Sequence, residues 1–235
     1  MRLAVMQPYI FPYIGYFQLI YASDKFVFYD DVDFIKGGWI NRNKLLVNGK
    51  ENLFTIPLEK PSSFKLINEI DLHPQLYTKW KKKIKRTLEQ SYSKAPYYED
   101  VIPLVYNVLD HENDKISDLA MKSILSICEY LNIDRNFYIS SEKFSNFKEI
   151  NRSDRLIEMA KKLNTDEYIN MEGGKHLYDK NYFSENFIQL KFLKPKFKKY
   201  DQGREEFFSG LSIIDILMFN NKESAREIIK EFELV

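Results

Sequence analysis

The chain has 235 residues, which is enough to bury a sizeable core in one large domain or two small ones. Its 35 Lys and Arg residues nearly balance 34 Asp and Glu residues, so the net charge of +1 provides no global field that would draw the protein to nucleic acid or an anionic membrane. The apolar share of 44% is typical of a globular chain, and the single cysteine excludes an internal disulfide and a cysteine-based zinc cluster.

The N-terminal region is apolar but has neither the length nor the flanks of a targeting segment. No apolar run approaches the roughly 18 residues that a membrane span needs. Pro8, Pro12 and Gly15 interrupt the first apolar stretch, and no small-residue cleavage site follows it. We therefore expect a cytoplasmic protein with no membrane span.

The first 31 residues predict a βαβ unit. Residues 2–6 form a short apolar run typical of a buried strand, and a turn rich in Pro and Tyr follows. Residues 14–23 have apolar side chains at helical spacing, and residues 25–31 form a second apolar run that ends in two acids. Such a unit implies a parallel sheet with a right-handed crossover.

The next segment predicts a long loop and then a hairpin-like excursion, because Gly37-Gly38 and Asn48-Gly49 are turn dipeptides. Residues 74–131 have helical patterns throughout, and the first of these patterns places Leu76, Trp80, Ile84 and Leu88 on one apolar face. The basic run within them, 79–86, is typical of a solvated helix face, and a second interpretation is a docking face for an acidic carrier protein.

The remaining chain alternates short apolar runs with amphipathic helical patterns, with Ser153 as a candidate helix N-cap. Strands are expected at 137–140, 166–171 and 187–193, and helices at 153–163, 211–219 and 222–232. This alternation predicts the α/β class. We expect a three-layer, Rossmann-like parallel sheet in a single domain, 1–235, with 74–131 as a helical insertion or subdomain.

Polar side chains are unusually dense between residues 7 and 42. Gln7 follows the first predicted strand, and Asp30 and Asp31 end the second. In open α/β sheets ligands bind beyond the carboxyl ends of the strands, so these groups are expected to converge on one crevice. Trp39 is interpreted either as core or as a stacking platform. Arg42 suits a phosphate or carboxylate fork, with a structural ion pair to Asp30 or Asp33 as the alternative.

The turn after the first strand invites comparison with nucleotidylyltransferases, in which a His-x-Gly-His turn opens a helix that holds nucleotide phosphates. Here the segment reads Tyr13-Ile14-Gly15-Tyr16. The glycine is in place, but tyrosine supplies no imidazolium charge. The comparison therefore favours a nucleotidylyltransferase-like fold and argues against nucleotidyl transfer.

A second cluster lies in the C-terminal half. Gly173-Gly174 follows a predicted strand, and backbone N–H groups at such a turn can hold an anion. His176 and Tyr178 follow closely. Further candidates are Gln202, Ser212 and Asp215; the Ser-x-x-Asp spacing of the last two is also that of a helix cap. No nucleophile elbow, Walker loop or histidine pair at metal-ligand spacing occurs.

The stretch AVMQPYIFPYIGYFQLI…DKFVFYDDVDFIKGGWINRN resembles the opening of the WbqC-like family of bacterial polysaccharide gene clusters. The segments YINMEGGKHLYDKNYF and YDQGREEFFSGLSIIDILMFN resemble later parts of that family in the same order. The resemblance implies a role in making cell-surface glycans such as O-antigen. It also implies the transfer of acyl or aminoacyl groups to nucleotide-activated amino sugars.

These inferences lead to a hypothesis of amide formation from a thioester. The acyl group would come from a carrier protein or CoA, with no tightly bound cofactor and no metal. An attacking amine must be neutral, so a carboxylate base, Asp30 or Asp31, is expected. Lys36, Tyr13 or backbone N–H groups near Gly15 would stabilise the oxyanion, and Arg42 with the Gly173-Gly174 turn would bind the pyrophosphate. The expected substrate-binding residues are Gln7, Tyr9, Gly15, Tyr16, Trp39, Asn41, Arg42, Gly173, Gly174, His176, Tyr178, Gln202, Ser212 and Asp215.

Two alternatives stay open at this point. One is an ATP-dependent amide ligase of nucleotidylyltransferase-like fold, which would release AMP. The other is a non-catalytic module that presents a sugar nucleotide or a carrier protein to another enzyme.

Overall fold

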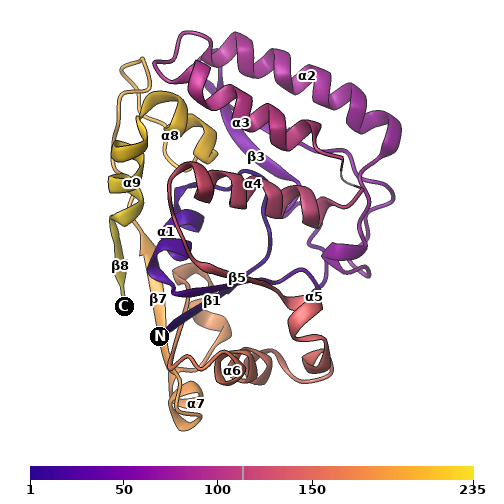
Figure 1. Cartoon of the computed structure of the whole chain (residues 1–235), viewed down its shortest axis with the longest axis vertical. Coiled ribbons are helices and arrows are strands. Elements are labelled where there is room, and N and C mark those ends of the chain that lie inside the picture. Colours follow the sequence, from indigo (N-terminus) through magenta and orange to yellow (C-terminus); the bar gives the residue numbers. More distant parts are fainter. Residues whose placement is uncertain (113) are drawn as a thin grey trace.

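The structure, a computed structural model, describes residues 1–112 and 114–235 and has a central sheet between layers of helices (Figure 1). The sheet has six strands in the order β5-β2-β1-β6-β7-β8, and β3 and β4 form a separate antiparallel pair. Strand β8 runs antiparallel to β7, and the other pairings within the sheet are parallel. The strands are β1 (Arg2–Met6), β2 (Lys25–Phe28), β3 (Arg42–Val47), β4 (Lys50–Thr55), β5 (Asn136–Ile139), β6 (Glu167–Met171), β7 (Gln189–Pro195) and β8 (Phe232–Leu234).

The helices confirm the predicted alternation and hence the mixed α/β class. They are α1 (Ile14–Ala22), α2 (Pro74–Tyr92), α3 (Tyr98–Asp110), α4 (Ile116–Tyr130), α5 (Ser140–Lys143), α6 (Arg152–Lys162), α7 (Lys180–Glu185), α8 (Ile213–Phe219) and α9 (Lys222–Lys230). Among the described residues, no helix combines the length and the apolar character that crossing a membrane requires.

The sheet buries both faces because side chains along each strand alternate between them. In β1, Leu3 and Val5 pack on one face with the buried residues of α6, whereas Ala4 packs on the other with α1. In β2, Val27 and Phe26 divide in the same way. Figure 1 accordingly shows α6 and α7 on one side of the sheet and α1 and α4 on the other. This arrangement explains why the strands read as continuous apolar runs.

The β1-α1-β2 unit is parallel, as predicted, with Leu3 opposite Lys25 and Met6 opposite Phe28. Strand β6 pairs in parallel along the other side of β1. The carboxyl ends of β1, β2 and β6 therefore share one edge of the sheet. Chain order runs outward from β1 to β2 and β5 on one side, and to β6 and β7 on the other. The order thus reverses between β1 and β6, and such reversals are where open α/β sheets bind ligands.

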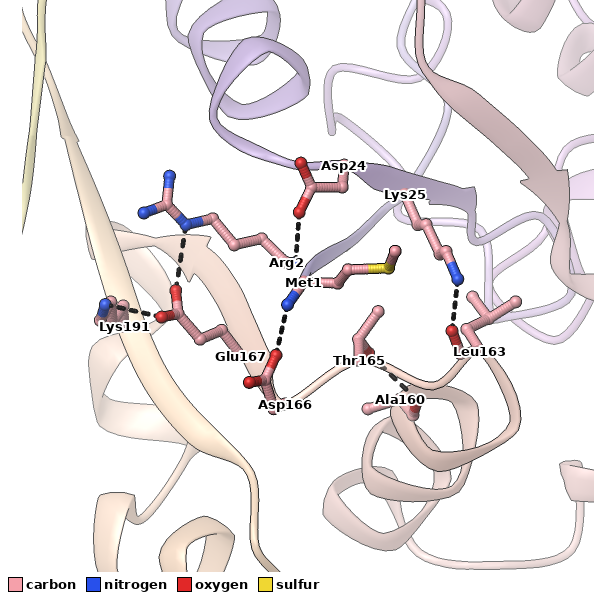
Figure 2. A network of polar contacts seen from close by, with 10 residues as sticks. All are labelled: Met1, Arg2, Asp24, Lys25, Ala160, Leu163, Thr165, Asp166, Glu167 and Lys191. Carbon is pink, nitrogen blue, oxygen red and sulfur yellow. Dashed lines mark hydrogen bonds and ion pairs between the residues drawn. The ribbon is translucent and has the colours of Figure 1, made fainter.

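The opposite edge, at the amino ends of the strands, is closed by a polar network (Figure 2). The Arg2 guanidinium contacts Glu167 at 3.1 Å, and Lys191 contacts the other oxygen of the same carboxylate at 3.1 Å. The Lys25 ammonium donates to the backbone carbonyl of Leu163. Exposed ion pairs of this kind contribute little individually, about 0–1 kcal/mol, so the network mainly ties adjacent strand ends together.

The predicted hairpin corresponds to β3 and β4. Asn48 and Gly49 both have positive φ, 49° and 80°, as a two-residue type I′ turn requires. Helices α2, α3 and α4 occupy the predicted helical segment, and their buried residues join the core that also contains α1. The description of 74–131 as an insertion within one domain stays a proposal.

Three local predictions were wrong. The second strand ends at Phe28 instead of continuing to residue 31, which leaves the acids in the connection that follows it. The N-cap of α6 is Asn151, whose side chain accepts from the backbone N–H of Asp154, so Ser153 lies inside the helix. Leu76, expected on the buried face of α2, is 46% exposed. In that helix Tyr77 is buried instead.

Candidate functional site

A cleft of about 1080 Å³ lies at the carboxyl edge of the sheet. Gln7 after β1, Asp31 after β2 and Asn170 at the end of β6 all line it, so the three neighbouring strands converge there. Six tyrosines contribute to its walls: Tyr9, Tyr13, Tyr16, Tyr29, Tyr168 and Tyr178. A cleft that combines aromatic surface with a few polar groups is typical of small-molecule sites.

The tyrosine hydroxyls of the cleft remain protonated near neutral pH. Burial raises the pKa of Tyr13 to about 12, and burial raises the pKa values of Tyr9 and Tyr16 as well. Tyr16 donates to the backbone carbonyl of Gln7 at 3.0 Å, which fixes the chain where it leaves β1. Protonated hydroxyls are hydrogen-bond donors, and because Tyr16 and Tyr9 donate to the backbone and the side chain of Gln7, Tyr13 is the neutral donor that these three residues offer to a ligand.

Gly15, in the first turn of α1, leaves room for the Tyr13 side chain to pack against the helix. A Cβ atom at Gly15 would lie 2.5–2.7 Å from the Tyr13 ring and hydroxyl, closer than packed atoms approach. The Tyr13 ring also stacks on Phe197, with centroids 6.1 Å apart. The glycine expected to bind substrate does not itself line the cleft. Gly15 therefore has a structural role, because the absence of a side chain there makes room for the Tyr13 ring.

The aspartates after β2 differ sharply in their surroundings. Asp30 is buried, and its carboxylate accepts from the backbone N–H of Ser141 at 2.9 Å, from the Ser141 hydroxyl at 2.6 Å and from Asn68 at 3.1 Å. It is not among the residues that line the cleft. Asp30 therefore joins the start of α5 to the short 3-10 helix Ile67–Glu69, which contains Asn68.

Asp31 lines the cleft as half of a buried ion pair. Its Oδ2 lies 2.6 Å from Arg155 Nη2, and the two side chains are 0% and 6% exposed. Arg155 also donates to the Ser140 hydroxyl at 3.1 Å, and its guanidinium lies 4.8 Å from the centre of the Tyr29 ring. Among the described residues, Asp31 Oδ1 and Arg155 Nε have no hydrogen-bond partner.

Asp33 is the solvent-open carboxylate of the cleft. The residue is exposed and lines the cleft, and its backbone bridges to Leu66. Within the described chain no hydrogen bond or ion pair engages its side chain. The sequence suggested Asp33 only as an ion-pair partner for Arg42, a pair that the structure does not contain. Asp31 and Asp33 are two residues apart, a spacing that places both side chains on one side of an extended segment and Asp30 on the other, and this spacing was the signal available for Asp33.

The expected site residues therefore divide into two groups. Those that line the cleft are Gln7, Tyr9, Tyr13, Tyr16, Asp31, Trp39, Gly173, Gly174 and Tyr178. Those that do not line it are Gly15, Asp30, Lys36, Asn41, Arg42, His176, Gln202, Ser212 and Asp215.

Arg42 and its neighbours support the loop beside the cleft. The Arg42 guanidinium lies 5.5 Å from the centre of the Trp39 ring, a cation–π contact, and the expected pairing with Asp30 or Asp33 is not found. Asn41 is buried and donates to the carbonyl of Ile56 at 2.9 Å. Lys36 is exposed. The Arg42 guanidinium, which was expected to bind a diphosphate, thus packs against the Trp39 ring and does not line the cleft.

The C-terminal candidates form a buried network. The Asp215 carboxylate accepts from Tyr200 at 2.5 Å, from Gln202 at 2.8 Å and from Tyr92 at 2.9 Å. Burial raises the pKa of Asp215, and the three hydrogen bonds oppose that rise. Ser212 caps α8 through the backbone N–H of Ile214 at 3.3 Å, as the capping interpretation predicts. The network fastens α8 to α2 and to the loop after β7.

The cleft also contains residues to which no sequence pattern pointed, namely Lys148, Arg152, Arg155 and Asn170. The two arginines lie in the first turns of α6, which follows β5 and α5 in the chain. The sequence signal that could have identified them is the occurrence of cationic residues after a predicted strand. Asn170 Oδ1 accepts from the backbone N–H of Met171 at 2.8 Å, which orients the chain as it leaves β6. In the part of the chain that the structure describes, no three His, Cys, Asp or Glu side chains gather as metal ligands would.

The structure is that of a mixed α/β protein with a large cleft at the carboxyl edge of a mostly parallel sheet. Residues 7–227 match the model of the WbqC-like protein family, and the chain belongs to that family. It is 25% identical over 232 residues to an uncharacterized protein of Mycobacterium tuberculosis, Rv1507c, and the alignment covers 97% of each chain. No solved structure matches the chain.

Proposed function

We propose that the protein is an N-acyl- or aminoacyltransferase that modifies the amine of a nucleotide-activated amino sugar in polysaccharide biosynthesis. The acyl donor is a thioester of CoA or of a carrier protein. The observation that carries the proposal is the cleft of about 1080 Å³, lined by tyrosines together with the open carboxylate of Asp33 and two cations, Lys148 and Arg152, that are unpaired among the described residues. Ligand pockets typically span about 300–1,000 Å³, so this cleft has room for a sugar nucleotide and an acyl group.

The strand order supports a Rossmann-like fold. The turn that contains Gly15 suggests that this fold is of the nucleotidylyltransferase-like kind. Taken in chain order, the five parallel strands are arranged 3-2-1-4-5. The cleft lies where β1 and β6 diverge, which is the usual place for a nucleotide in doubly wound sheets.

The proposed reaction needs one base. The neutral sugar amine attacks the thioester carbonyl, a C–N bond forms, the C–S bond breaks, and the proton lost by nitrogen is returned to the departing thiolate. Asp33 is the proposed base because its carboxylate is open to solvent in the cleft. Asp30 is occupied by three hydrogen bonds and Asp31 by Arg155, so they are assigned to holding the cleft wall.

Tyr13 is the proposed donor to the oxygen on which charge develops. Its hydroxyl remains protonated at neutral pH, because burial raises its pKa to about 12, and it is therefore a donor throughout the working range. Trp39 offers an exposed ring for stacking on a base or a sugar. Gly173 would present open backbone to the ligand, since nothing lies within 4 Å of a Cβ built there.

The test is a thiol-release assay on the purified protein. Acetyl-CoA is mixed with a panel of UDP- and dTDP-linked amino sugars, and free thiol and N-acetylated sugar are measured together. The proposal expects equal amounts of both products, and none when the amine of the sugar is replaced by a hydroxyl. AMP release from ATP during amide formation would favour the ligase instead. Sugar-nucleotide binding without turnover, with CoA and carrier-protein thioesters alike, would favour the binding module.

A further inference from the structure

Two cations of the cleft have no hydrogen-bond or ion-pair partner among the described residues. Lys148 lies in the turn before α6, and Arg152 is the first residue of that helix. Both line the cleft, and in the described chain neither side chain makes a hydrogen bond or an ion pair. By contrast, Lys161 in the last turn of the same helix pairs with Glu158 at 2.9 Å. Unpaired cations along one stretch of cleft wall are available to a ligand.

The charges of the cleft are divided among its elements. Its charged residues are Asp31, Asp33, Lys148, Arg152 and Arg155. Asp31 and Arg155 neutralise each other within the buried pair. What remains is one open carboxylate on the connection after β2 and two open cations at the start of α6. A ligand that carries an amine and an anionic group matches this distribution.

The first turn of α6 offers backbone donors to an anion, and the carboxylate in that turn, Asp154, accepts from the Asn151 side chain and the Tyr182 hydroxyl. The helix runs for eleven residues, and backbone N–H groups at its first turn carry the positive end of its dipole. The Asn151 side chain accepts from the backbone N–H of Asp154, which leaves other first-turn donors to a ligand. Arg155, 6% exposed, lines the same cleft and keeps Nε without a partner.

We propose that Lys148, Arg152 and the first turn of α6 form the subsite for the diphosphate of the substrate. This proposal rests on the proposed function for the identity of the whole ligand, but its chemistry requires only a diphosphate group. It moves the diphosphate from Arg42, which contacts Trp39 but does not itself line the cleft, to the α6 side of the cleft. The sugar amine is then directed towards Asp33.

Calorimetric titration with inorganic pyrophosphate tests the subsite without any sugar or acyl donor. Each of Lys148→Gln and Arg152→Gln should weaken binding about 10-fold, as expected for one charge-assisted hydrogen bond, and the double variant about 100-fold. Lys161→Gln makes the same charge change on the same helix and should bind as the wild type does. Melting temperatures without ligand should match the wild type for Lys148→Gln, Arg152→Gln and the double variant, because in the described chain neither cleft cation has a hydrogen bond or an ion pair to lose.

The results separate the subsite from the reaction. Pyrophosphate binding that is absent in the wild type, or unchanged in the double variant, would overturn the subsite. If thiol release works, the subsite also predicts a higher KM for the sugar nucleotide in Arg152→Gln with kcat little changed. Pyrophosphate binding that depends on both cations, with no acyl transfer to any amino sugar, would uphold the subsite and refute the transferase proposal alone.

Discussion

The cleft wall depends on the buried pair of Asp31 and Arg155, and Arg155→Met probes it most sharply. Methionine fills much of the space of arginine but supplies no charge, so the Asp31 carboxylate would remain buried without its cation. The pair is 0% and 6% exposed, so solvent cannot replace the lost contact. Removing one partner of such a pair costs about 3–5 kcal/mol. For a chain of this length that corresponds to a fall in Tm of about 6–20 °C.

Urea unfolding followed by circular dichroism measures this change. The double variant Asp31→Leu/Arg155→Met should recover most of the loss, because replacing both charges by apolar groups of similar size is often neutral. Lys161→Met is the matched control, since it breaks an exposed pair and should cost no more than about 1 kcal/mol. A loss below about 1 kcal/mol in Arg155→Met would refute the account of the pair as a buried structural unit.

Three further predictions concern the reaction, the Tyr13 wall and the C-terminal network. Asp33→Asn should lower kcat by about 10²–10⁴-fold in the thiol-release assay with Tm unchanged, and undiminished turnover would remove its role as base. Gly15→Ala should displace the Tyr13 ring and weaken sugar-nucleotide binding in calorimetry while the fold is kept; an unchanged affinity would contradict the contribution of Tyr13. Burial raises the pKa of Asp215 above 3.8, so the folded state binds more protons, and the contribution of Asp215 to stability falls as pH rises from about 4 through its folded pKa. In urea unfolding, Asp215→Asn should lose this pH dependence, and an identical slope in both proteins would speak against the raised pKa.

Much of the fold was predictable because its signals are local. The β1-α1-β2 unit follows from apolar periodicities within about 30 residues, and the hairpin turn follows from the conformational freedom of Asn48-Gly49. The capping role of Ser212 was likewise visible in its spacing to Asp215. Such patterns involve residues that are close together in the sequence, and interactions between those residues determine most secondary structure.

The roles of individual site residues were less accessible, because distant partners decide them. Asp30 and Asp31 are adjacent in sequence, yet Asp30 is engaged by Ser141 and Asp31 by Arg155, more than 100 residues away. Those contacts leave Asp33 as the open carboxylate. No local pattern distinguishes an acid that supports the fold from one that faces a ligand.

The central claim is that one cleft at the carboxyl edge of the sheet holds an activated amino sugar. A crystal structure of the protein soaked with a UDP- or dTDP-linked amino sugar tests it most directly. The account predicts the sugar amine beside Asp33 and the diphosphate between Lys148 and Arg152. Electron density for the ligand elsewhere on the molecule, with this cleft left empty, would contradict it.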